Sequence, residues 1–487
     1  MGELVEVGIS PVSPDRFQEV LTPEQFRAFT EQVDQALHLL AGRTIWNINS
    51  TTAGGGVAEM LRSLVAYVKG AGLDARWLVI PGDPAFFRVT KRIHNHLHSS
   101  PGDSGQLDEE ARLIYESALA ESAEQVVARV RARDIVIVHD PQPAGLVPPL
   151  REHGAHVVWR CHVGLDEPDD LARNAWRFLL PYVRPAEAYV FSRANFAWEG
   201  LDPQRISVIP PSIDAFSTKN RAMAKEQVWA LLQGAGVVAG EPRAPRAAPV
   251  FTRMDGTEIA LRHKAHMFQT AAATLQDRLV VQVSRWDRLK DPLGVIRGFA
   301  DHVAPASDAH LLLAGPEVEG VVDDPEGGQV LMDCLAAWGD LPSEVRSRVR
   351  LAILPMADVE ENAALVNAIQ RQAWIVVQKS LAEGFGLTVS EAMWKGRPVV
   401  ASAIGGIQNQ IDHGATGLLI RNPRDLAEYG AAVRSLLDDP DRAARIGNSA
   451  RERVRDHFLG PRHLLQYADL TRRLVERERR SLASSGQ

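Results

Sequence analysis

The stretch "TIWNINSTTAGGGVAEMLRSLVAYVKG", residues 44–70, joins two different hydrophobic patterns through a row of glycines. Its first six residues, 44–49, are rich in the β-branched and aromatic residues typical of a buried strand. After the glycines, apolar residues recur at the i, i+3, i+4, i+7 spacing of a half-buried helix. These residues are Val57, Met60, Leu61, Leu64, Val65 and Val68. Because Gly70 and Gly72 suit a helix end, the stretch predicts one strand–loop–helix unit.

The glycine loop lies where such a helix begins. Free backbone N–H groups and the helix dipole favour an anion at that place. A tight turn is the alternative; it explains one glycine well and three in a row poorly, so we favour a ligand facing Gly55 and Gly56. A dinucleotide fingerprint would require glycine at position 59, where the sequence has Glu59.

Short apolar runs alternate with helical patterns along nearly the whole chain. The first series of expected strands is 44–49, 134–140, 156–163, 188–192 and 206–211. The second series is 278–285, 310–316, 349–355, 374–380, 398–404 and 417–421. Continuous apolar strands separated by helices indicate parallel sheets covered on both faces. We therefore predict an α/β protein with two doubly wound, Rossmann-like domains, and ligands at the carboxyl ends of the strands in a cleft between them.

The two series set the expected domain boundaries. We expect an N-terminal domain over 1–216 and a C-terminal domain over 276–460, with the charged terminal helix 461–487 crossing back to the first. Residues 217–275 contain an Ala-, Gly- and Pro-rich loop and then "VFTRMDGTEIALRH" (250–263), whose Asp-Gly pair predicts a hairpin turn. We interpret 217–275 as an insertion between the domains.

Composition limits the class of partner. The 487 residues carry a formal net charge of −7, which argues against nucleic acid as the main partner. The two cysteines, Cys161 and Cys334, lack metal-like spacing and fit a reducing, cytoplasmic compartment. Because no uninterrupted apolar run is long enough to span a bilayer, we expect no membrane partner.

A second loop with glycines occurs in "WIVVQKSLAEGFGLTVSEAMWKG" (374–396), which has a strand–loop–helix pattern. Glu383 lies in its loop, and Glu391 lies about one turn into its helix, at roughly 1.5 Å rise per residue. Gly384 and Gly386 allow a ligand to approach the backbone closely. A charged surface would explain either glutamate alone, but it does not explain both together with the glycines.

This loop has the parts that a nucleotide sugar needs. The first helical amides, near Leu387 and Thr388, can hold a diphosphate. From there Glu391 can reach back to a ribose, and Glu383 can meet a sugar hydroxyl. The loop is therefore a candidate donor site.

Basic and acidic residues follow several other predicted strands. Arg285 and Lys290 in "VSRWDRLKDP" (283–292) can neutralise a departing diphosphate without a metal, although a basic residue at one strand end is a weak signal by itself. His162 and Asp140 lie at two further strand ends. A lone histidine at such a place is more often structural than catalytic.

These residues together resemble a known enzyme family. Arg285, Lys290 and two glutamates separated by seven residues resemble family 4 of the retaining glycosyltransferases, which have the GT-B architecture. Further motifs resemble the trehalose glycosyltransferring synthases. They are "NSTTAGGGVAEML", "ARWLVIPGDPAFFRVTKRIHN", "VHDPQPAG", "PPSID", "VSRWDRLKDPLGVI" and "EGFGLTVSEAMWKGRPVV". The resemblance covers most of 44–460, and the segment 217–275 departs from it by its length.

The resemblance implies reversible transfer of glucose from a nucleoside diphosphate glucose, such as UDP- or ADP-glucose, to glucose, giving α,α-trehalose with retention. It implies His162, Glu383, Arg285 and Lys290 as catalytic residues. The residues implied in donor binding are Gly55, Gly56, Arg285, Lys290, Glu383, Gly384, Phe385, Gly386, Leu387, Thr388 and Glu391. Those implied on the acceptor side are Asn49, Asp140 and His162.

The resemblance implies no required cofactor or metal. The only literal D-x-D, Asp439 to Asp441, falls in an expected surface turn, and we interpret it as structural. The alternatives are a trehalose phosphorylase, a family 4 enzyme with another acceptor, a sugar-nucleotide sensor without turnover and, least favoured, an NAD-dependent enzyme. The partners expected are sugars and nucleotide sugars. The sequence leaves the oligomeric state open, with a homodimer as one possibility.

Overall fold

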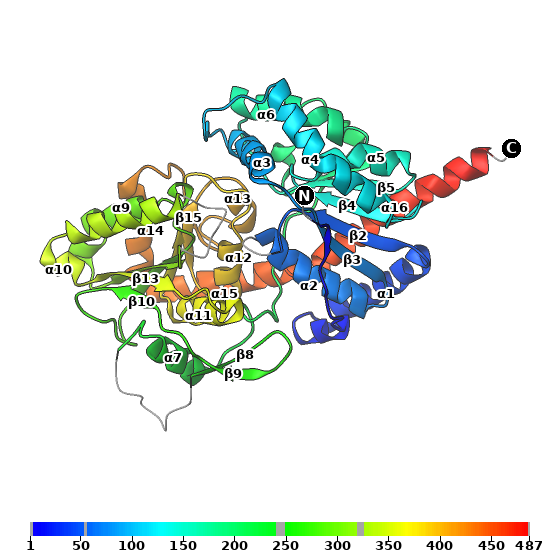
Figure 1. The fold of residues 1–487 in the computed structure, drawn as a ribbon. Helices are drawn as coiled ribbons and strands as arrows, with labels where there is room; N and C mark the ends of the chain where they lie inside the picture. The colour runs from blue at the N-terminus through cyan, green and yellow to red at the C-terminus, as the bar shows by residue number, and fades with distance from the viewer. Residues whose placement is uncertain (1–2, 53–55, 240–248, 319–325, 486–487) are drawn as a thin grey trace. The chain divides into compact units, whose positions relative to one another are not determined.

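The computed structural model describes residues 3–52, 56–239, 249–318 and 326–485. The chain forms two compact units (Figure 1). The first contains Met1–Ser212 and Gly460–Gln487, and the second contains Ile213–Leu459. Each unit has its own sheet, so the expected α/β class with two doubly wound domains is confirmed.

The first unit is built on a seven-stranded sheet with the order β1-β3-β2-β4-β5-β6-β7. Its strands are β1 (Val5–Glu6), β3 (Asp74–Val79), β2 (Thr44–Asn49), β4 (Ile135–His139), β5 (His156–Cys161), β6 (Ala188–Phe191) and β7 (Ile206–Val208). All pairs are parallel except β1 with β3. The five strands expected from the sequence are all present. The chain order reverses between β2 and β4, which makes their carboxyl ends a topological switch point.

Two strands of this sheet were missed by the sequence analysis. In β3, the exposed Asp74 and Arg76 alternate with buried residues, so the apolar run is interrupted. The strand β1 has only two residues, too few to give a periodic signal.

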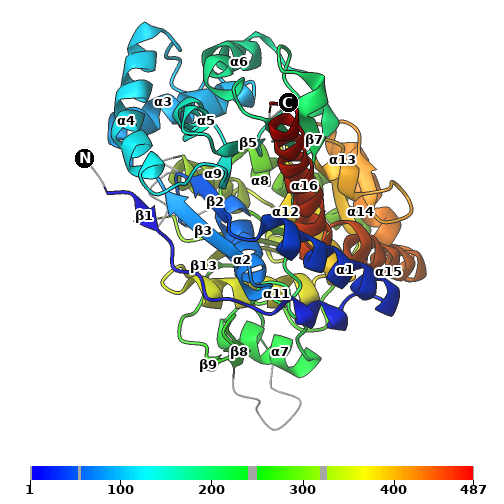
Figure 2. The same cartoon turned by 90° about the vertical axis from the view of Figure 1, so that its right-hand side faces the viewer.

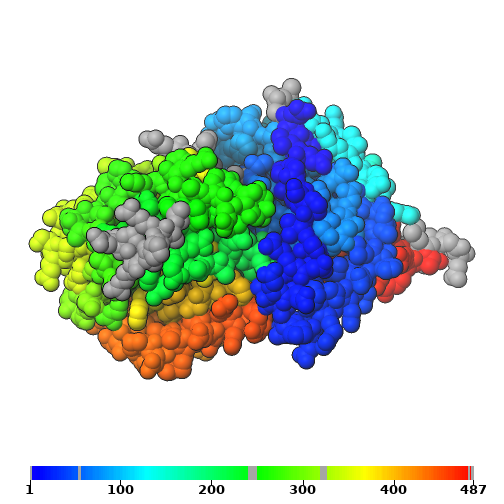
Figure 3. All heavy atoms as spheres, turned by 90° about the horizontal axis from the view of Figure 1, so that it is seen from below, coloured from blue at the N-terminus to red at the C-terminus, as the bar shows by residue number. Residues whose placement is uncertain are grey.

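Helices cover both faces of the first sheet (Figures 1 and 2). They are α1 (Pro23–Leu40), α2 (Gly56–Gly70), α3 (Pro84–Leu97), α4 (Glu109–Val127), α5 (Val147–Glu152), α6 (Asp170–Val183) and α16 (Gly460–Ser485). The helices α3 to α6 pack on the face that carries Trp46, Val136 and Trp159. The helices α1, α2 and α16 cover the opposite face. In Figure 3 the dark-blue N-terminal segment, with β1 and α1, runs over the outside of this unit.

The helix α16 returns the end of the chain to the first unit, as expected for 461–487. Its Leu470 and Leu474 are buried against Ile137 and Val158 of the sheet. Near its end, Glu478 accepts a hydrogen bond of 2.6 Å from Arg43.

The second unit contains another seven-stranded sheet, with the order β10-β13-β12-β11-β14-β15-β16. Its strands are β10 (His266–Phe268), β13 (Val349–Leu354), β12 (His310–Pro316), β11 (Leu279–Val283), β14 (Ile375–Gln378), β15 (Val399–Ser402) and β16 (Leu418–Ile420). All pairs are parallel except β10 with β13. All six strands expected here are present, and the order reverses between β11 and β14.

The helices of the second unit again lie on both sides of the sheet. They are α7 (Lys225–Gly234), α8 (Pro292–His302), α9 (Gly327–Gly339), α10 (Ser343–Arg346), α11 (Val359–Gln372), α12 (Leu387–Trp394), α13 (Ile407–Gln410), α14 (Leu426–Leu437) and α15 (Pro440–His457). One hydrophobic core joins α8, α9, α14 and the start of α15 to the sheet. Among the described residues, no helix is both long and apolar enough to cross a membrane.

Residues 217–275 belong to the second unit and do not form a separate insertion between domains. The expected hairpin is present: β8 (Val250–Thr252) pairs antiparallel with β9 (Glu258–Ala260), and Gly256 in the turn has φ +88°. Beyond it, His263 Nδ1 lies 2.9 Å from the buried Glu361 of α11, and β10 extends the sheet. The sequence suggested an insertion because the pairing that joins this segment to the sheet, β10 with β13, links residues about 90 positions apart.

Candidate active site

The predicted site residues lie at the two switch points, one group in each unit. In the second unit, the loops after β11 and β14 carry Lys290 and Glu383. In the first unit, the ends of β2, β4 and β5 carry Asn49, Asp140 and His162. Neighbouring parallel strands end at the same edge of a sheet, so each group is brought together by topology.

Lys290 and Glu383 form the central contact of the second group. Lys290 Nζ lies 2.6 Å from Glu383 Oε2, and the two side chains are 18% and 12% exposed. The Ser380 hydroxyl also points to Glu383 Oε2, at 3.4 Å. A cation and a carboxylate therefore share one sheltered place beside the switch point.

The backbone around this pair is firmly held. The Gln282 amide donates a hydrogen bond of 2.9 Å to the Lys290 carbonyl oxygen. The Leu381 N–H donates to the Leu289 carbonyl at 2.7 Å, which ties the two loops together. Asp291 forms an ion pair with the fully buried Lys379. These bonds fix the positions of the loops that present Lys290 and Glu383.

Arg285 lies further out in the same loop. Its side chain is 46% exposed, and its guanidinium is 3.5 Å from Asp287. Asp287 also accepts a hydrogen bond from the Leu289 N–H at 2.8 Å, which starts the short 3₁₀ turn Arg288–Lys290. The structure thus places Lys290 in direct contact with Glu383, and Arg285 beside a different carboxylate.

The helix α12 begins in the expected glycine loop. Gly386 has φ +81° and no side chain caps the helix start, so the first amides, at Leu387 and Thr388, are not used by a capping group. A Cβ on Gly386 would lie 3.2 Å from Glu383 Cγ and 3.1 Å from Ile407. The Thr388 hydroxyl donates to Gln378, and Phe385 is buried. Glycine at 386 therefore lets the helix start lie close to Glu383.

Glu391 of α12 is almost completely buried. It is 2% exposed, and its Oε1 lies 3.7 Å from Lys219. Its Oε2 has no hydrogen-bond partner within the described residues. Burial lowers the pKa of the nearby Lys395, and the Glu391 carboxylate opposes that shift. The structure therefore contains a buried acceptor atom here that a donor group would satisfy.

In the first unit, Asp140 and His162 lie together at the ends of the neighbouring strands β4 and β5. Asp140 has φ +66°, and its carboxylate accepts a hydrogen bond of 2.8 Å from the His162 backbone N–H. Burial raises the pKa of Asp140 to about 6, while the bond from His162 and the charge of Arg160 act in the opposite direction. Burial and nearby positive charge lower the pKa of His162 well below its usual value, so the imidazole is neutral.

Two residues next to Asp140 and His162 were missed by the sequence analysis. His139 and Arg160 are Cα partners on β4 and β5, and they are 2% and 0% exposed. The available signal was a charged or titratable residue near the end of each apolar strand, one position before Asp140 and two before His162. Both were read as parts of strands.

Asn49 lies at the end of β2, and its side chain forms hydrogen bonds with neighbouring residues. The side-chain Oδ1 of Asn49 accepts a hydrogen bond of 2.8 Å from the Trp77 indole, and its Nδ2 donates one of 2.8 Å to the Thr51 carbonyl oxygen. Asn49 therefore shapes the end of β2. Gly56 is the first residue of α2, whereas Gly55 lies outside the described residues.

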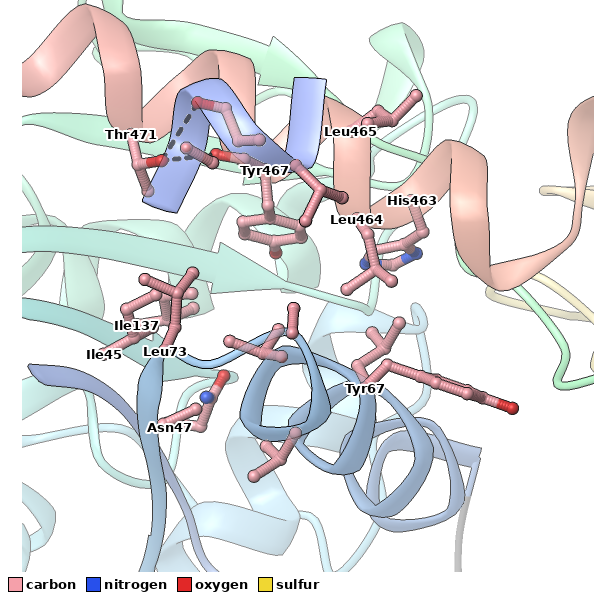
Figure 4. A pocket seen from close by; sticks show the side chains of 18 of the residues that line it. Ile45, Asn47, Tyr67, Leu73, Ile137, His463, Leu464, Leu465, Tyr467 and Thr471 are labelled. Carbon is pink, nitrogen blue, oxygen red and sulfur yellow. Dashed lines mark hydrogen bonds between the residues drawn. The ribbon is translucent and has the colours of Figure 1, made fainter. Parts of the chain in front are cut away.

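An apolar cavity of about 110 Å³ lies behind the first group (Figure 4). Figure 4 shows Leu464 and Tyr467 of α16 above the cavity and α2 below it. Asn47 and His139 form part of its wall. On this side, away from the strand ends, Asn47 and His139 are thus surrounded mostly by apolar side chains.

Comparison with known proteins identifies the family. The family described as "Trehalose synthase, N-terminal domain" matches residues 47–198, and "Glycosyl transferases group 1" matches 359–453. The trehalose synthase of Pyrococcus horikoshii is 32% identical over 470 residues, with 96% of this chain and 98% of the relative covered. The chain belongs to the trehalose synthase family. A trehalose synthase from Rubrobacter xylanophilus is 35% identical, over 87% of this chain and 89% of its own.

Solved structures agree on the fold. The α,α-trehalose-phosphate synthase (UDP-forming) of Burkholderia vietnamiensis has a TM-score of 0.63 at 15% identity, covering 88% of this chain and 98% of its own. The expected GT-B architecture is thus confirmed. Membership of the trehalose synthase family makes this protein a trehalose-related glycosyltransferase.

The predicted D-x-D stretch has a structural role. Asp439 caps α15 by accepting a hydrogen bond of 2.9 Å from the Arg442 N–H. In the part of the chain that the structure describes, no three His, Cys, Asp or Glu side chains are grouped as metal ligands. The cap supports the interpretation of Asp439 as a structural residue.

Proposed function

We propose that this protein transfers glucose reversibly from a nucleoside diphosphate glucose to free glucose and forms α,α-trehalose with retention of configuration. The observation that carries this proposal is the contact of 2.6 Å between Lys290 and Glu383 beside the start of α12. It combines, at one switch point, a cation for phosphate, a carboxylate for sugar hydroxyls and free helical amides.

The donor's parts correspond to different residues of the second unit. The diphosphate is held by the α12 amides at Leu387 and Thr388 and by Lys290, with Arg285 supplying additional charge. The ribose hydroxyls donate to the buried Glu391 carboxylate, whose Oε2 lacks a partner within the described chain. The glucose hydroxyls donate to Glu383.

The chemical step needs no covalent intermediate in this proposal. The bond between glucose C1 and the phosphate oxygen breaks, and its electron pair stays on the phosphate. The acceptor hydroxyl oxygen forms the new bond to C1 on the same face, and its proton passes to a phosphate oxygen. Lys290 stabilises the charge that gathers on the phosphate, since a fixed charge needs little reorganisation during the reaction.

His162 stabilises the reacting sugar in this proposal, and Asp140 holds its backbone. Both groups belong to the first unit, as does Asn49, and we assign these three residues to the acceptor side. The neutral state of the His162 imidazole fits a group that orients a polyhydroxylated substrate. A charged imidazolium would oppose the positive character developing at C1.

A donor and acceptor panel tests the function. Purified protein is incubated with UDP-glucose or ADP-glucose plus glucose, and in parallel with trehalose plus inorganic phosphate, and the products are separated by chromatography. We expect trehalose and nucleoside diphosphate in the first arm. Glucose 1-phosphate formed only in the second arm would instead show a trehalose phosphorylase, and nucleotide binding without product in either arm would show a sensor.

In this proposal Lys290 and Arg285 neutralise the negative charge on the leaving group, so the reaction requires no metal. We expect trehalose formation to continue at an unchanged rate after dialysis against EDTA. Loss of activity that magnesium restores would overturn this part of the proposal. The Lys290→Ala variant should have the same reduced rate with and without EDTA, because in this proposal the missing positive charge comes from the lysine and not from a metal.

A further inference from the structure

A chain of polar side chains crosses the end of the first sheet. Arg160 Nε lies 3.5 Å from His162 Nδ1, His162 Nε2 lies 3.2 Å from His139 Nδ1, and His139 Nε2 lies 3.1 Å from Asn47 Oδ1. The two imidazole rings are nearly parallel, at 13°, with centroids 5.5 Å apart. The rings thus meet edge to edge, as an in-plane N–H···N bond requires.

Burial keeps both imidazoles neutral. Burial and the charge of Arg160 lower the pKa of His139 to about 3. The pKa of His162 is lowered by burial and by Arg160, His139 and His463. A neutral imidazole has one N–H donor and one bare nitrogen acceptor, so each ring must choose a tautomer.

Arg160 indicates the direction in which these side-chain hydrogen bonds are donated. A guanidinium can only donate, so the Arg160 contact of 3.5 Å favours a bare Nδ1 on His162 and a proton on its Nε2. That proton is donated to His139 Nδ1, which leaves the His139 proton on Nε2, facing the Asn47 carbonyl oxygen. The reverse direction would place an N–H of His162 against an N–H of Arg160. The orientation of the Asn47 amide agrees with this result but is not needed for it.

The inner end of this series of contacts is buried, and His463 lines the same cavity. Asn47 and His139 are 7% and 2% exposed and form part of the wall of the apolar cavity between α2 and α16 (Figure 4). Most of the side chains that line this cavity are apolar, and such a cavity does not favour water. The Asn47–His139 bond is therefore protected from exchange with solvent.

We propose that His139 is a positioning residue that, together with Arg160, fixes His162 as the Nε2–H tautomer and holds its ring at the end of β5. This inference rests on the proposed function only for its effect on turnover. The tautomer itself is a property of the protein without substrate. His139 touches no reacting atom and acts through His162.

Two substitutions each remove one of the two hydrogen-bond contacts of His139 and keep the other. His139→Asn places an amide oxygen near the former Nδ1 and keeps the acceptor for His162, but it loses the contact with Asn47. His139→Gln places an amide nitrogen near the former Nε2 and keeps the contact with Asn47, but it removes the acceptor for His162. If His139 acts through His162, only the second substitution changes the His162 ring.

The test uses the full chain with ¹⁵N-labelled histidine rings, and the His162 signals are assigned by their loss in His162→Gln. Protonated and bare ring nitrogens have well-separated chemical shifts. We expect an Nε2–H tautomer in the wild type and in His139→Asn, and a mixture of tautomers in His139→Gln. In that variant kcat should also fall about tenfold, the effect of one lost hydrogen bond, with KM for the nucleotide sugar unchanged.

A wild-type His162 protonated on Nδ1 would overturn the proposal, and this outcome does not depend on the folding of any variant. An unchanged Nε2–H tautomer in folded His139→Gln would overturn it as well. Absence of trehalose formation by the wild type would contradict the proposed function and leave the tautomer result standing. Thermal unfolding of both variants shows whether a lower rate comes from loss of the fold.

Discussion

At the scale of single residues, the contact between Lys290 and Glu383 has the clearest consequence. We predict that Lys290→Ala lowers kcat by about 10²–10³, because fixed charge at a developing phosphate contributes that much. Arg288→Ala is the matched control: it lies in the same 3₁₀ turn, but its side chain is 65% exposed and 3.8 Å from Asp333. Initial rates of trehalose formation measure both. Equal losses in the two variants would remove the specific role of Lys290.

Asp140 gives a prediction about pH. Its pKa is raised to about 6, so the folded state holds a proton that the unfolded chain releases near pH 4. The stability that comes from this proton is present at low pH and is lost as pH rises from 4 through 6. Asp140→Asn cannot titrate but still offers an oxygen to the His162 N–H. Urea unfolding should show the variant gaining stability relative to the wild type between pH 4.5 and 7.5. A constant difference would contradict the raised pKa.

At the scale of elements, the start of α12 depends on a glycine in the left-handed region. Gly386→Ala should cost about 1–2 kcal/mol of stability for its backbone and also displace Glu383, because the new Cβ would lie 3.2 Å from Glu383 Cγ. Gly396→Ala at φ +69° carries the same backbone cost, but its nearest neighbour is 3.8 Å away. We expect lower melting temperatures in both variants and a lower kcat only in the first. A normal rate in Gly386→Ala would show that Glu383 tolerates displacement.

The elements also show what could be predicted from sequence. All eleven expected strands and the hairpin formed, because each is a local apolar run bounded by turn residues. The strand β3 was missed because its pattern is broken by Asp74 and Arg76. Residues 217–275 were not assigned to the second unit because the pairing of β10 with β13 is a long-range contact. The loop residues Lys290 and Glu383 were predicted as site residues from their charge and their positions after apolar strands. Their contact of 2.6 Å, and the participation of His139 and Arg160, depend on the strand order, which no local pattern contains.

At the scale of the whole molecule, the last helix completes the first unit. Leu470 of α16 is 3% exposed and packs on the sheet. Leu470→Ala should lower the free energy of unfolding by about 2–5 kcal/mol, the usual cost of removing a buried leucine side chain. Leu113→Ala in α4 is the control, since Leu113 is 56% exposed. Denaturant unfolding followed by tryptophan fluorescence compares them. A similar small loss in both would mean that α16 contributes little to the first unit.

The central claim is retaining transfer of glucose from a nucleotide donor to glucose. Its most direct test is NMR of the product made from UDP- or ADP-glucose labelled with ¹³C at C1, with unlabelled glucose as acceptor. The proposed function predicts α,α-trehalose in which one α-configured anomeric carbon carries the label, with one nucleoside diphosphate released per disaccharide. A labelled β anomeric centre, or label recovered only as free glucose, would contradict it.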